Sequence, residues 1–248
     1  MGQARTVHII QHLEHIPAGY LADYLISEGT QVNLIRAWEL DGTCFSNALS
    51  KVKTTDSLVV LGGSMNAYAD TEYPWLKAVR ELLVRRPREK WVTAEDKLAK
   101  PTSETESAGK TLGICLGHQL AAVAFGGSVE VGALQPAEKS IIQIQWRPHE
   151  LSEILNHPRY VFADHNDRVG KVPAQATVIA ENKNGVQALS YGENYLTVQF
   201  HPEVNEQVLY SWFKESEPEN LNTYLEDYSK KQALIAETSR KLASWLVE

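Results

Sequence analysis

Residues 111–127 read TLGICLGHQLAAVAFGG, and this stretch decides the fold. Its first four residues are largely apolar and predict a buried strand, and residues 117–125 predict a helix. Cys115 stands at the turn between them. Gly113 and Gly117 flank this cysteine, and because they lack a Cβ the chain can reverse tightly and a ligand can approach closely. The first N–H groups and the positive dipole end of the helix face the sulfur, which favours its thiolate form.

The rest of the chain alternates strands with helices and then becomes rich in strands. We expect strands at residues 7–11, 32–37, 57–61, 111–114, 128–131, 140–145, 160–163, 176–180, 186–190 and 196–200, and further helices at residues 18–28, 73–86, 206–214 and 221–247. This order predicts an α/β fold with a mainly parallel central sheet, helices on both faces, extra antiparallel strands and a helical C-terminus. Ligands of such sheets bind beyond the carboxyl ends of the strands, where Leu61, Cys115 and His201 are expected to lie.

The length of 248 residues suits a single domain over residues 1–248. Within it, residues 85–110 are charged and rich in Lys, Glu, Ser and Thr. We expect an inserted loop there, and a solvated loop is favoured over a lid on the site. Residues 205–248 are expected to form C-terminal helices.

The composition predicts a soluble cytoplasmic enzyme. The formal net charge is −7 and no long basic run occurs, which argues against nucleic acid and membranes as partners. No apolar stretch reaches the length of a membrane span. The two cysteines, Cys44 and Cys115, make no disulfide framework, so a reducing compartment is expected. Residues 41–45 predict a loop, in which Cys44 is an inert thiol.

A second motif, QFHPE at residues 199–203, supplies a base and a carboxylate. His201 can take the thiol proton of Cys115 and later give it to a leaving amine. Pro202 favours extended backbone at His201, so Glu203 projects to the same side and can hold the imidazole tautomer. The two motifs together predict a Cys-His-Glu hydrolase.

Attack on a carbonyl creates an oxyanion that needs hydrogen-bond donors. The N–H of Leu116 is one candidate, and residues 62–65, which read GGSM after an expected strand, are the candidate source of another. His8, His12 and His15 are close in sequence, but no cysteine or tight acidic set completes a metal site. We therefore expect these histidines to pack, and no metal is predicted.

These segments resemble the class I (triad) glutamine amidotransferases, in their stand-alone GMP-synthase-like branch, over most of the chain. Two specific motifs carry the resemblance: residues 113–119 fit G-x-C-x-G-x-Q, and residues 199–203 fit Q-F-H-P-E. Supporting matches lie at residues 11–19, 61–63, 70–76, 165–167 and 173. The sequence departs from the family at Leu61, where a proline is usual, and at Gln145, where a glycine is common. The resemblance implies a flavodoxin-like, three-layer fold.

The resemblance also implies a role for eight residues. It makes Cys115 the nucleophile, His201 the base and Glu203 the orienting acid; it places Gly63 and Leu116 in the oxyanion hole; and it assigns substrate contacts to Gln119, Val161 and Phe162, the last two largely through backbone groups.

The implied reaction is hydrolysis of the γ-amide of glutamine or of a γ-glutamyl compound through a Cys115 γ-glutamyl thioester, without a cofactor. Three alternatives stay open: a γ-glutamyl peptidase acting on glutathione-like peptides, a glutaminase subunit that depends on a separate synthetase, and a non-catalytic binding or regulatory module. The chain has neither a Ser-Gly-Gly-x-Asp-Ser loop nor a Walker A pattern. Any synthetase that uses the ammonia would therefore be another polypeptide.

Overall fold

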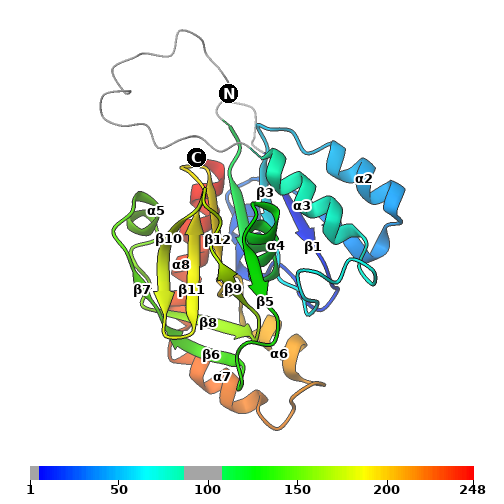
Figure 1. Ribbon diagram of the computed structural model, residues 1–248. Coiled ribbons are helices and arrows are strands. Elements are labelled where there is room, and N and C mark those ends of the chain that lie inside the picture. Colours follow the sequence, from blue (N-terminus) through cyan, green and yellow to red (C-terminus); the bar gives the residue numbers. More distant parts are fainter. Residues whose placement is uncertain (1–5, 87–107) are drawn as a thin grey trace.

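The computed structural model describes residues 6–86 and 108–248 (Figure 1). Its strands are β1 (Thr6–Gln11), β2 (Gln31–Arg36), β3 (Ser57–Val60), β4 (Thr111–Ile114), β5 (Ser128–Glu130), β6 (Glu138–Gln143), β7 (Gln145–Trp146), β8 (Tyr160–His165), β9 (Arg168–Lys171), β10 (Thr177–Asn182), β11 (Gly185–Ser190) and β12 (Tyr195–Val198). Its helices are α1 (Gly19–Ser27), the 3-10 helix η1 (Ala37–Glu39), α2 (Gly42–Ser50), α3 (Trp75–Arg85), α4 (Leu116–Ala124), α5 (Glu150–Ile154), α6 (Glu206–Phe213), α7 (Leu221–Ser229) and α8 (Gln232–Val247).

An eight-stranded sheet forms the centre of the described residues, in the order β2-β1-β3-β4-β12-β11-β10-β7. The first five strands pair in parallel, and β11, β10 and β7 continue the sheet with antiparallel pairs. Parallel neighbours require long crossovers, and α1 connects β1 to β2 in this way. The predicted α/β fold, with a mainly parallel sheet and extra antiparallel strands, is confirmed.

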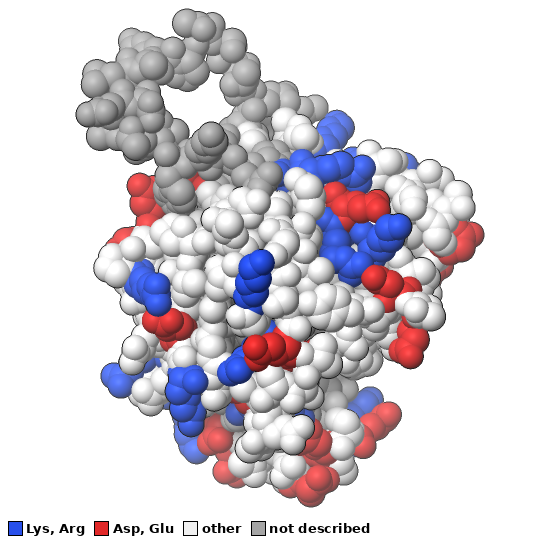
Figure 2. Space-filling view, in the orientation of Figure 1, with Lys and Arg blue, Asp and Glu red and all other residues white. Residues whose placement is uncertain are grey.

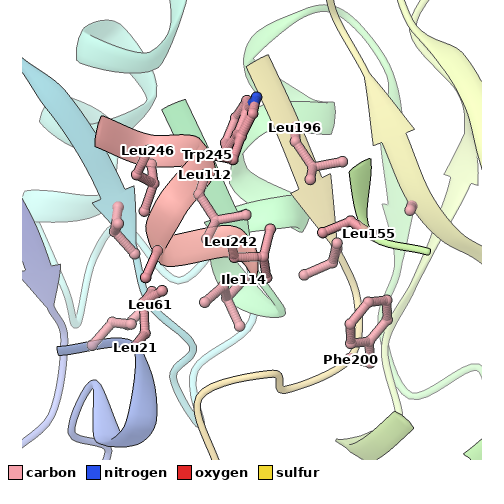
Figure 3. Close-up of a cluster of buried hydrophobic side chains, with 14 of the residues drawn as sticks. Leu21, Leu61, Leu112, Ile114, Leu155, Leu196, Phe200, Leu242, Trp245 and Leu246 are labelled. Atoms are coloured by element: carbon pink, nitrogen blue, oxygen red, sulfur yellow. The ribbon is translucent and has the colours of Figure 1, made fainter. Parts of the chain in front are cut away.

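Alternate residues of the parallel strands enter two separate cores, one on each face of the sheet. Ile9 belongs to the core shared with α1 and α8, whereas its neighbour Ile10 belongs to the core shared with α2, α3 and α4. Figure 3 shows Leu242 and Trp245 of α8 packed near Leu112 of β4. Both faces are therefore covered, as predicted, and the strand ends are held rigidly between two layers of helices.

Two short antiparallel pairs, β6 with β8 and β5 with β9, lie outside the central sheet. A third apolar cluster joins α6 and α7 to β8, through Phe162, Val208, Phe213 and Tyr228. The C-terminal helices predicted for residues 205–248 thus brace the pair β6–β8 (Figure 1).

The prediction of a loop around Cys44 is wrong, because residues 42–50 form α2. Asp41 caps this helix: its carboxylate accepts a hydrogen bond from the backbone N–H of Cys44 at 2.7 Å. Phe45 and Leu49, four residues apart, are buried on one helix face. The cap and the buried pair decide in favour of a helix.

The region predicted as helical at residues 221–247 consists of two helices, α7 and α8, which are separated by Lys230 and Lys231. The sequence analysis also missed β7, β9 and α5, which are between two and five residues long. Such short elements are fixed by tertiary pairing rather than by a periodic pattern.

The predicted insertion at residues 85–110 lies mostly outside the described residues. None of the helices in the two described ranges is both long enough and apolar enough to cross a lipid bilayer. Acidic and basic side chains are interspersed over the face drawn in Figure 2.

Candidate active site

Cys115 stands at a sharp turn between β4 and α4. Its backbone has φ 49° and ψ −101°, a conformation that non-glycine residues rarely adopt. Its N–H donates to the carbonyl of Val198 in β12 at 2.8 Å. Because Leu116 is the first residue of α4, its N–H belongs to the first turn, where no intrahelical carbonyl can accept it. Cys115 is therefore the N-cap residue of α4, directly before N–H groups that have no intrahelical partner.

The glycines beside Cys115 allow three backbone segments to approach closely. A Cβ on Gly117 would lie 2.2 Å from the carbonyl oxygen of Val60 in β3. A Cβ on Gly113 would lie 2.8 Å from the backbone of Gly117. Backbone atoms cannot move aside as a flexible side chain can, so only glycine fits here. The turn is thus locked to both neighbouring parallel strands.

His201 and Glu203 follow the end of β12 and are held together. His201 Nδ1 lies 2.7 Å from Glu203 Oε1, and both side chains are buried. The backbone N–H of His201 donates to the carbonyl of Phe162 at 2.8 Å. Because Nδ1 is engaged by the carboxylate, Nε2 is the ring nitrogen left to exchange a proton with a reacting group.

Burial by itself lowers the pKa of His201, but the charges of Glu203 and Cys115, and hydrogen bonds to both, raise that pKa well above its ordinary value. The surroundings of His201 therefore favour its protonated form beside the sulfur. A protonated histidine next to a cysteine is the arrangement that cysteine nucleophiles use.

Cys115 and His201 open into one cavity of about 430 Å³. The cavity lies beyond the carboxyl ends of β3, β4 and β12, where ligands of parallel sheets bind. Its lining consists of His15, Ile16, Gly63, Ser64, Met65, Cys115, Gln119, Ala137, Lys139, Asp164, His165, Asn166, Asp167, His201, Trp212, Phe213, Ser216 and Glu217. Predicted residues from three distant segments, Gly63, Cys115 with Gln119, and His201, therefore meet at one place.

Four predicted site residues do not line this cavity. Glu203 is completely buried behind His201, as an orienting carboxylate would be, and the side chain of Leu116 is buried in the core. Val161 and Phe162 lie in β8 with buried side chains. The carbonyl of Phe162 accepts the hydrogen bond from the backbone N–H of His201. The residues of this segment that line the cavity are 164–167, at the end of β8 and directly after it.

The glycine pair after β3 adjoins the reacting groups. A Cβ on Gly62 would lie 2.9 Å from His201 Cε1 and 3.5 Å from Cys115 Cβ. A Cβ on Gly63 would lie 2.7 Å from the end of the Leu116 side chain. The two segments predicted to supply oxyanion donors are thus neighbours in space.

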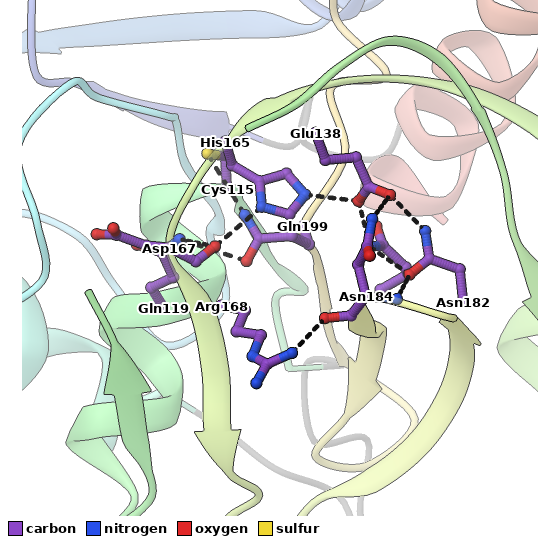
Figure 4. A network of polar contacts seen from close by, with 10 residues as sticks. Cys115, Gln119, Glu138, His165, Asp167, Arg168, Asn182, Asn184 and Gln199 are labelled. Carbon is purple, nitrogen blue, oxygen red and sulfur yellow. Dashed lines mark hydrogen bonds and ion pairs between the residues drawn. The ribbon is translucent and has the colours of Figure 1, made fainter. Parts of the chain in front are cut away.

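Gln119 and Gln199 form a chain of hydrogen bonds that reaches the sulfur (Figure 4). Gln119 Nε2 donates to Gln199 Oε1 at 3.3 Å, and Gln199 Nε2 lies 3.6 Å from Cys115 Sγ. The sequence analysis quoted Gln199 inside its motif without giving it a role. Because Gln199 lies two residues before His201, its side chain could have been expected on the same side of the strand as His201.

A buried polar network fixes the loop at the end of β8. His165 Nδ1 lies 2.9 Å from the carbonyl of Asp167, and Nε2 lies 3.0 Å from Glu138 Oε2 (Figure 4). Glu138 also accepts hydrogen bonds from three amides, those of Asn182, Asn184 and Gln187. Burial raises the pKa of Glu138, but the bonds to His165 and the amides leave that pKa below its ordinary value. The network holds residues 164–167 at the cavity.

A charged group at the cavity went unnoticed in the sequence. Lys139 of β6 pairs with Asp164 of β8 and with Glu217, which follows α6. Beside them, the ring of Trp212 meets that of His201 edge-on, with centroids 4.8 Å apart. No motif covers these positions. The one available signal was Asp164, an acid directly before His165 of the H-x-D stretch.

The histidines near the N-terminus lie in separate contacts. His8 lies 3.1 Å from Asp56 and 2.9 Å from Asn33, and His12 accepts a hydrogen bond from Trp75. Within the described part of the chain, no group of three or more His, Cys, Asp or Glu side chains is placed to hold a metal ion.

Comparison with known proteins points to one family. The model of the family described as glutamine amidotransferase class-I matches residues 90–211. One of the GMP synthase [glutamine-hydrolyzing] subunits, that from Pyrococcus furiosus, is 40% identical over 96 residues, which are 38% of this chain and 50% of that protein. Its counterpart from Methanocaldococcus jannaschii is 39% identical over 97 residues. These alignments span about half the length of the archaeal relatives.

Solved structures share the fold over the whole chain. A glutamine amidotransferase from Thermotoga maritima superposes with a TM-score of 0.74 at 23% identity, and the match covers 100% of both chains. A glutamine amidotransferase from Methylobacillus flagellatus gives a TM-score of 0.68 at 20% identity and covers 98% of this chain and 96% of that one.

Proposed function

Because the chain belongs to the class I glutamine amidotransferase family, in its GMP-synthase-like branch, we propose that it hydrolyses the γ-amide of glutamine or of a related γ-glutamyl compound. One observation carries the proposal. Cys115 and His201 open into the same cavity, while Glu203 engages the far nitrogen of His201 from a buried position. This arrangement provides a nucleophile, a proton carrier and an orienting carboxylate.

In the first half of the proposed reaction, the Cys115 sulfur attacks the γ-carbonyl carbon. The carbonyl electron pair moves onto oxygen, and the backbone N–H groups of Leu116 and Gly63 would stabilise the resulting charge. His201 then gives its proton to the amide nitrogen, the C–N bond breaks, and ammonia or an amine leaves. The γ-glutamyl group remains on Cys115 as a thioester.

In the second half, water attacks the thioester carbon. His201 accepts the proton from this water, and the C–S bond breaks to release the acid and restore Cys115. The net reaction consumes one amide and one water and yields glutamate and ammonia or an amine. It needs no redox partner, and Glu203 keeps His201 in the tautomer that both halves require.

The identity of the leaving amine stays open in this proposal, since glutamine and γ-glutamyl peptides form the same acyl group. Each of the matched archaeal relatives is named as one subunit of GMP synthase. That name favours a second version of the proposal, in which the activity depends on a separate synthetase polypeptide that uses the ammonia. We place the enzyme in the cytoplasm, because Cys44 and Cys115 are both free thiols.

The test is to identify the compound that acylates the protein. The full chain is incubated with glutamine and with glutathione-like peptides, glutamate release is followed, and intact mass is recorded. A γ-glutamyl adduct should form on the wild-type chain and on the Cys44→Ser control but not on Cys115→Ser. Modification that survives Cys115→Ser, or no adduct and no glutamate with any of these compounds, contradicts the proposal.

A further inference from the structure

The sulfur of Cys115 has a second polar neighbour besides His201. Gln199 Nε2 lies 3.6 Å from Cys115 Sγ and donates a hydrogen bond to it (Figure 4). The side chain of Gln199 is completely buried, whereas Cys115 opens into the cavity. The amide therefore meets the sulfur from the interior of the protein, and a substrate that enters through the cavity does not have to displace it.

Neighbouring groups fix which end of the Gln199 amide faces the sulfur. Gln119 Nε2 lies 3.3 Å from Gln199 Oε1 and 3.5 Å from the carbonyl oxygen of Asp167. A backbone carbonyl can only accept hydrogen bonds, so the end of the Gln119 amide beside it is the NH₂ group. That NH₂ group pairs with the oxygen of Gln199, which leaves the NH₂ group of Gln199 for the sulfur.

Both ends of this chain of hydrogen bonds are anchored. The backbone N–H of Gln199 donates to the carbonyl of Gln187 in β11 at 2.9 Å. The Asp167 carbonyl lies 2.9 Å from His165 Nδ1, within the network around Glu138. The donor at the sulfur is thus in place before a substrate arrives, and it needs no reorganisation when charge develops there.

A donor in this position responds to the charge on the sulfur. A hydrogen bond to an ionised acceptor is about twice as strong as one to a neutral acceptor, and a buried site strengthens it further. The sulfur is negative as a thiolate and neutral as a thiol or a thioester. Gln199 therefore favours the thiolate over both neutral forms, and only such a difference between states can accelerate a reaction.

We propose that Gln199 is a further catalytic residue, which donates a hydrogen bond to the Cys115 sulfur whenever that sulfur is negatively charged. The inference rests on the proposed function for its role in turnover. Before attack, Gln199 and the protonated His201 together maintain the thiolate. When water has added to the thioester, the C–S bond breaks, its electron pair moves onto sulfur, and Gln199 stabilises the departing thiolate. Gln119 has a positioning role, since it orients the Gln199 amide.

The experiment measures how fast iodoacetamide alkylates Cys115 in the full chain as a function of pH. The thiolate attacks the probe and releases iodide, so the rate follows the thiolate fraction. The variants are Gln199→Met, which keeps a similar volume without a donor, and Gln199→Glu, which places a carboxylate beside the sulfur. Gln232→Met is the matched control, because Gln232 donates to the Tyr20 hydroxyl at 3.0 Å at the start of α8. All chains carry Cys44→Ser, which removes the other thiol.

We expect the pH of half-maximal labelling to rise by about 1 unit in Gln199→Met, the equivalent of one hydrogen bond to a charged group. The rise should be larger in Gln199→Glu, because a like charge disfavours the thiolate. His201 and Glu203 titrate beside the sulfur in every chain, so the difference from the wild-type profile isolates Gln199. Gln232→Met should keep the wild-type profile.

The plateau of the labelling rate at high pH separates this role from a structural one. A more basic thiolate is the better nucleophile, so the plateau in Gln199→Met should equal the wild-type rate or exceed it by up to about threefold. A merely structural role of Gln199 would lower the plateau and leave the midpoint unchanged.

A second readout follows the thioester. The γ-glutamyl adduct is formed with glutamine, the glutamine is removed rapidly, and the decay of the adduct is followed by intact mass. Decay should be about 3- to 10-fold slower in Gln199→Met, because a more basic thiolate leaves more slowly. Equal decay rates in Gln199→Met and the wild-type chain overturn the role of Gln199 in the second half of the reaction.

An unchanged labelling midpoint in Gln199→Met overturns the inference and leaves the proposed function standing. The opposite combination is also distinguishable. Shifted midpoints, in a protein whose wild-type chain is acylated neither by glutamine nor by glutathione-like peptides, would support the hydrogen bond to the thiolate and overturn the proposed function.

Discussion

The cavity has two walls that are built in different ways. In the wall formed by the parallel half of the sheet, Cys115 and His201 are held through the backbone. The N–H of Cys115 bonds to Val198 of β12, the N–H of His201 bonds to Phe162 of the neighbouring strand β8, and the glycines 62, 113 and 117 allow close contacts. The opposite wall, formed by β6, β8 and the segment after α6, presents side chains that are held by other side chains.

The difference separates chemistry from recognition. Proton transfer and nucleophilic attack depend on geometry at the scale of one ångström, and backbone contacts supply that rigidity. Side-chain ion pairs such as that between Lys139 and Glu217 depend on charge and tolerate more freedom of position. Substitutions in the first wall should therefore lower kcat, and substitutions in the second should raise KM or destabilise the wall itself.

The largest expected effect is on the chemical step. In Glu203→Gln the buried amide keeps the shape of the carboxylate but cannot stabilise a protonated His201. We expect kcat for glutamate release to fall by about 10³- to 10⁴-fold, as in other triads that lose the orienting acid. The measurement is steady-state kinetics, with KM unchanged. A loss below about tenfold would mean that Glu203 does not orient the base.

The next effect tests the stability of the second wall. Glu138→Ala leaves the buried side chains of His165 and Gln187, and the partly buried amides of Asn182 and Asn184, without their acceptor. We expect the free energy of unfolding in urea to fall by about 3–5 kcal/mol, because the partners stay buried and uncompensated.

The control for this variant is Glu181→Gln, which removes an exposed pair with Arg147 and should cost about 1 kcal/mol or less. If the two variants were equally stable, side-chain pairing would not be what holds residues 164–167 in place.

A third prediction concerns the rigidity of the first wall. The Cβ of Gly62→Ala would meet His201 Cε1 at 2.9 Å and displace the imidazole. We expect kcat to fall by about 10²-fold, the usual consequence of a misplacement of about 1 Å. Gly42→Ala is the matched control, since its Cβ meets no atom within 4 Å, and it should keep wild-type kinetics. Wild-type activity in Gly62→Ala would show that the backbone of this wall can shift without displacing His201.

The smallest effect is on the pH dependence of stability. Burial lowers the pKa of His118 to about 3, and its Nδ1 lies 2.8 Å from Thr197 Oγ1. Because the unfolded chain protonates this histidine near pH 6.5 and the folded chain does not, stability falls as the pH drops below that value. We expect His118 to account for a loss of about 1 kcal/mol between pH 7 and pH 5.5.

Urea unfolding of the wild-type chain and of His118→Gln at the two pH values isolates this contribution. The variant should lose less stability than the wild-type chain on acidification. Parallel pH profiles of the two proteins would contradict the assignment of His118 as a buried neutral histidine.

Much of the first wall could be predicted from sequence because it is local. Gly113, Cys115 and Gly117 lie within one strand–turn–helix unit, and His201 and Glu203 lie two residues apart. The misses are of two kinds. The helix around Cys44 depended on a cap and on two buried residues that the sequence alone did not reveal. The second is the group of residues 164–167 at the end of β8, which lines the cavity and which the predicted site did not include.

The sequence by itself determined the α/β architecture and the elbow that carries Cys115, because strand, glycine and helix patterns act over a few neighbouring residues. Only the tertiary structure decided that Lys139 meets Glu217, 78 positions away, and that Gln119 reaches Gln199 and through it the sulfur. Pairs of this kind leave no period or motif in the chain. They form because antiparallel pairing and the packing of the last helices bring isolated polar residues to a place with little water, where each must find a partner.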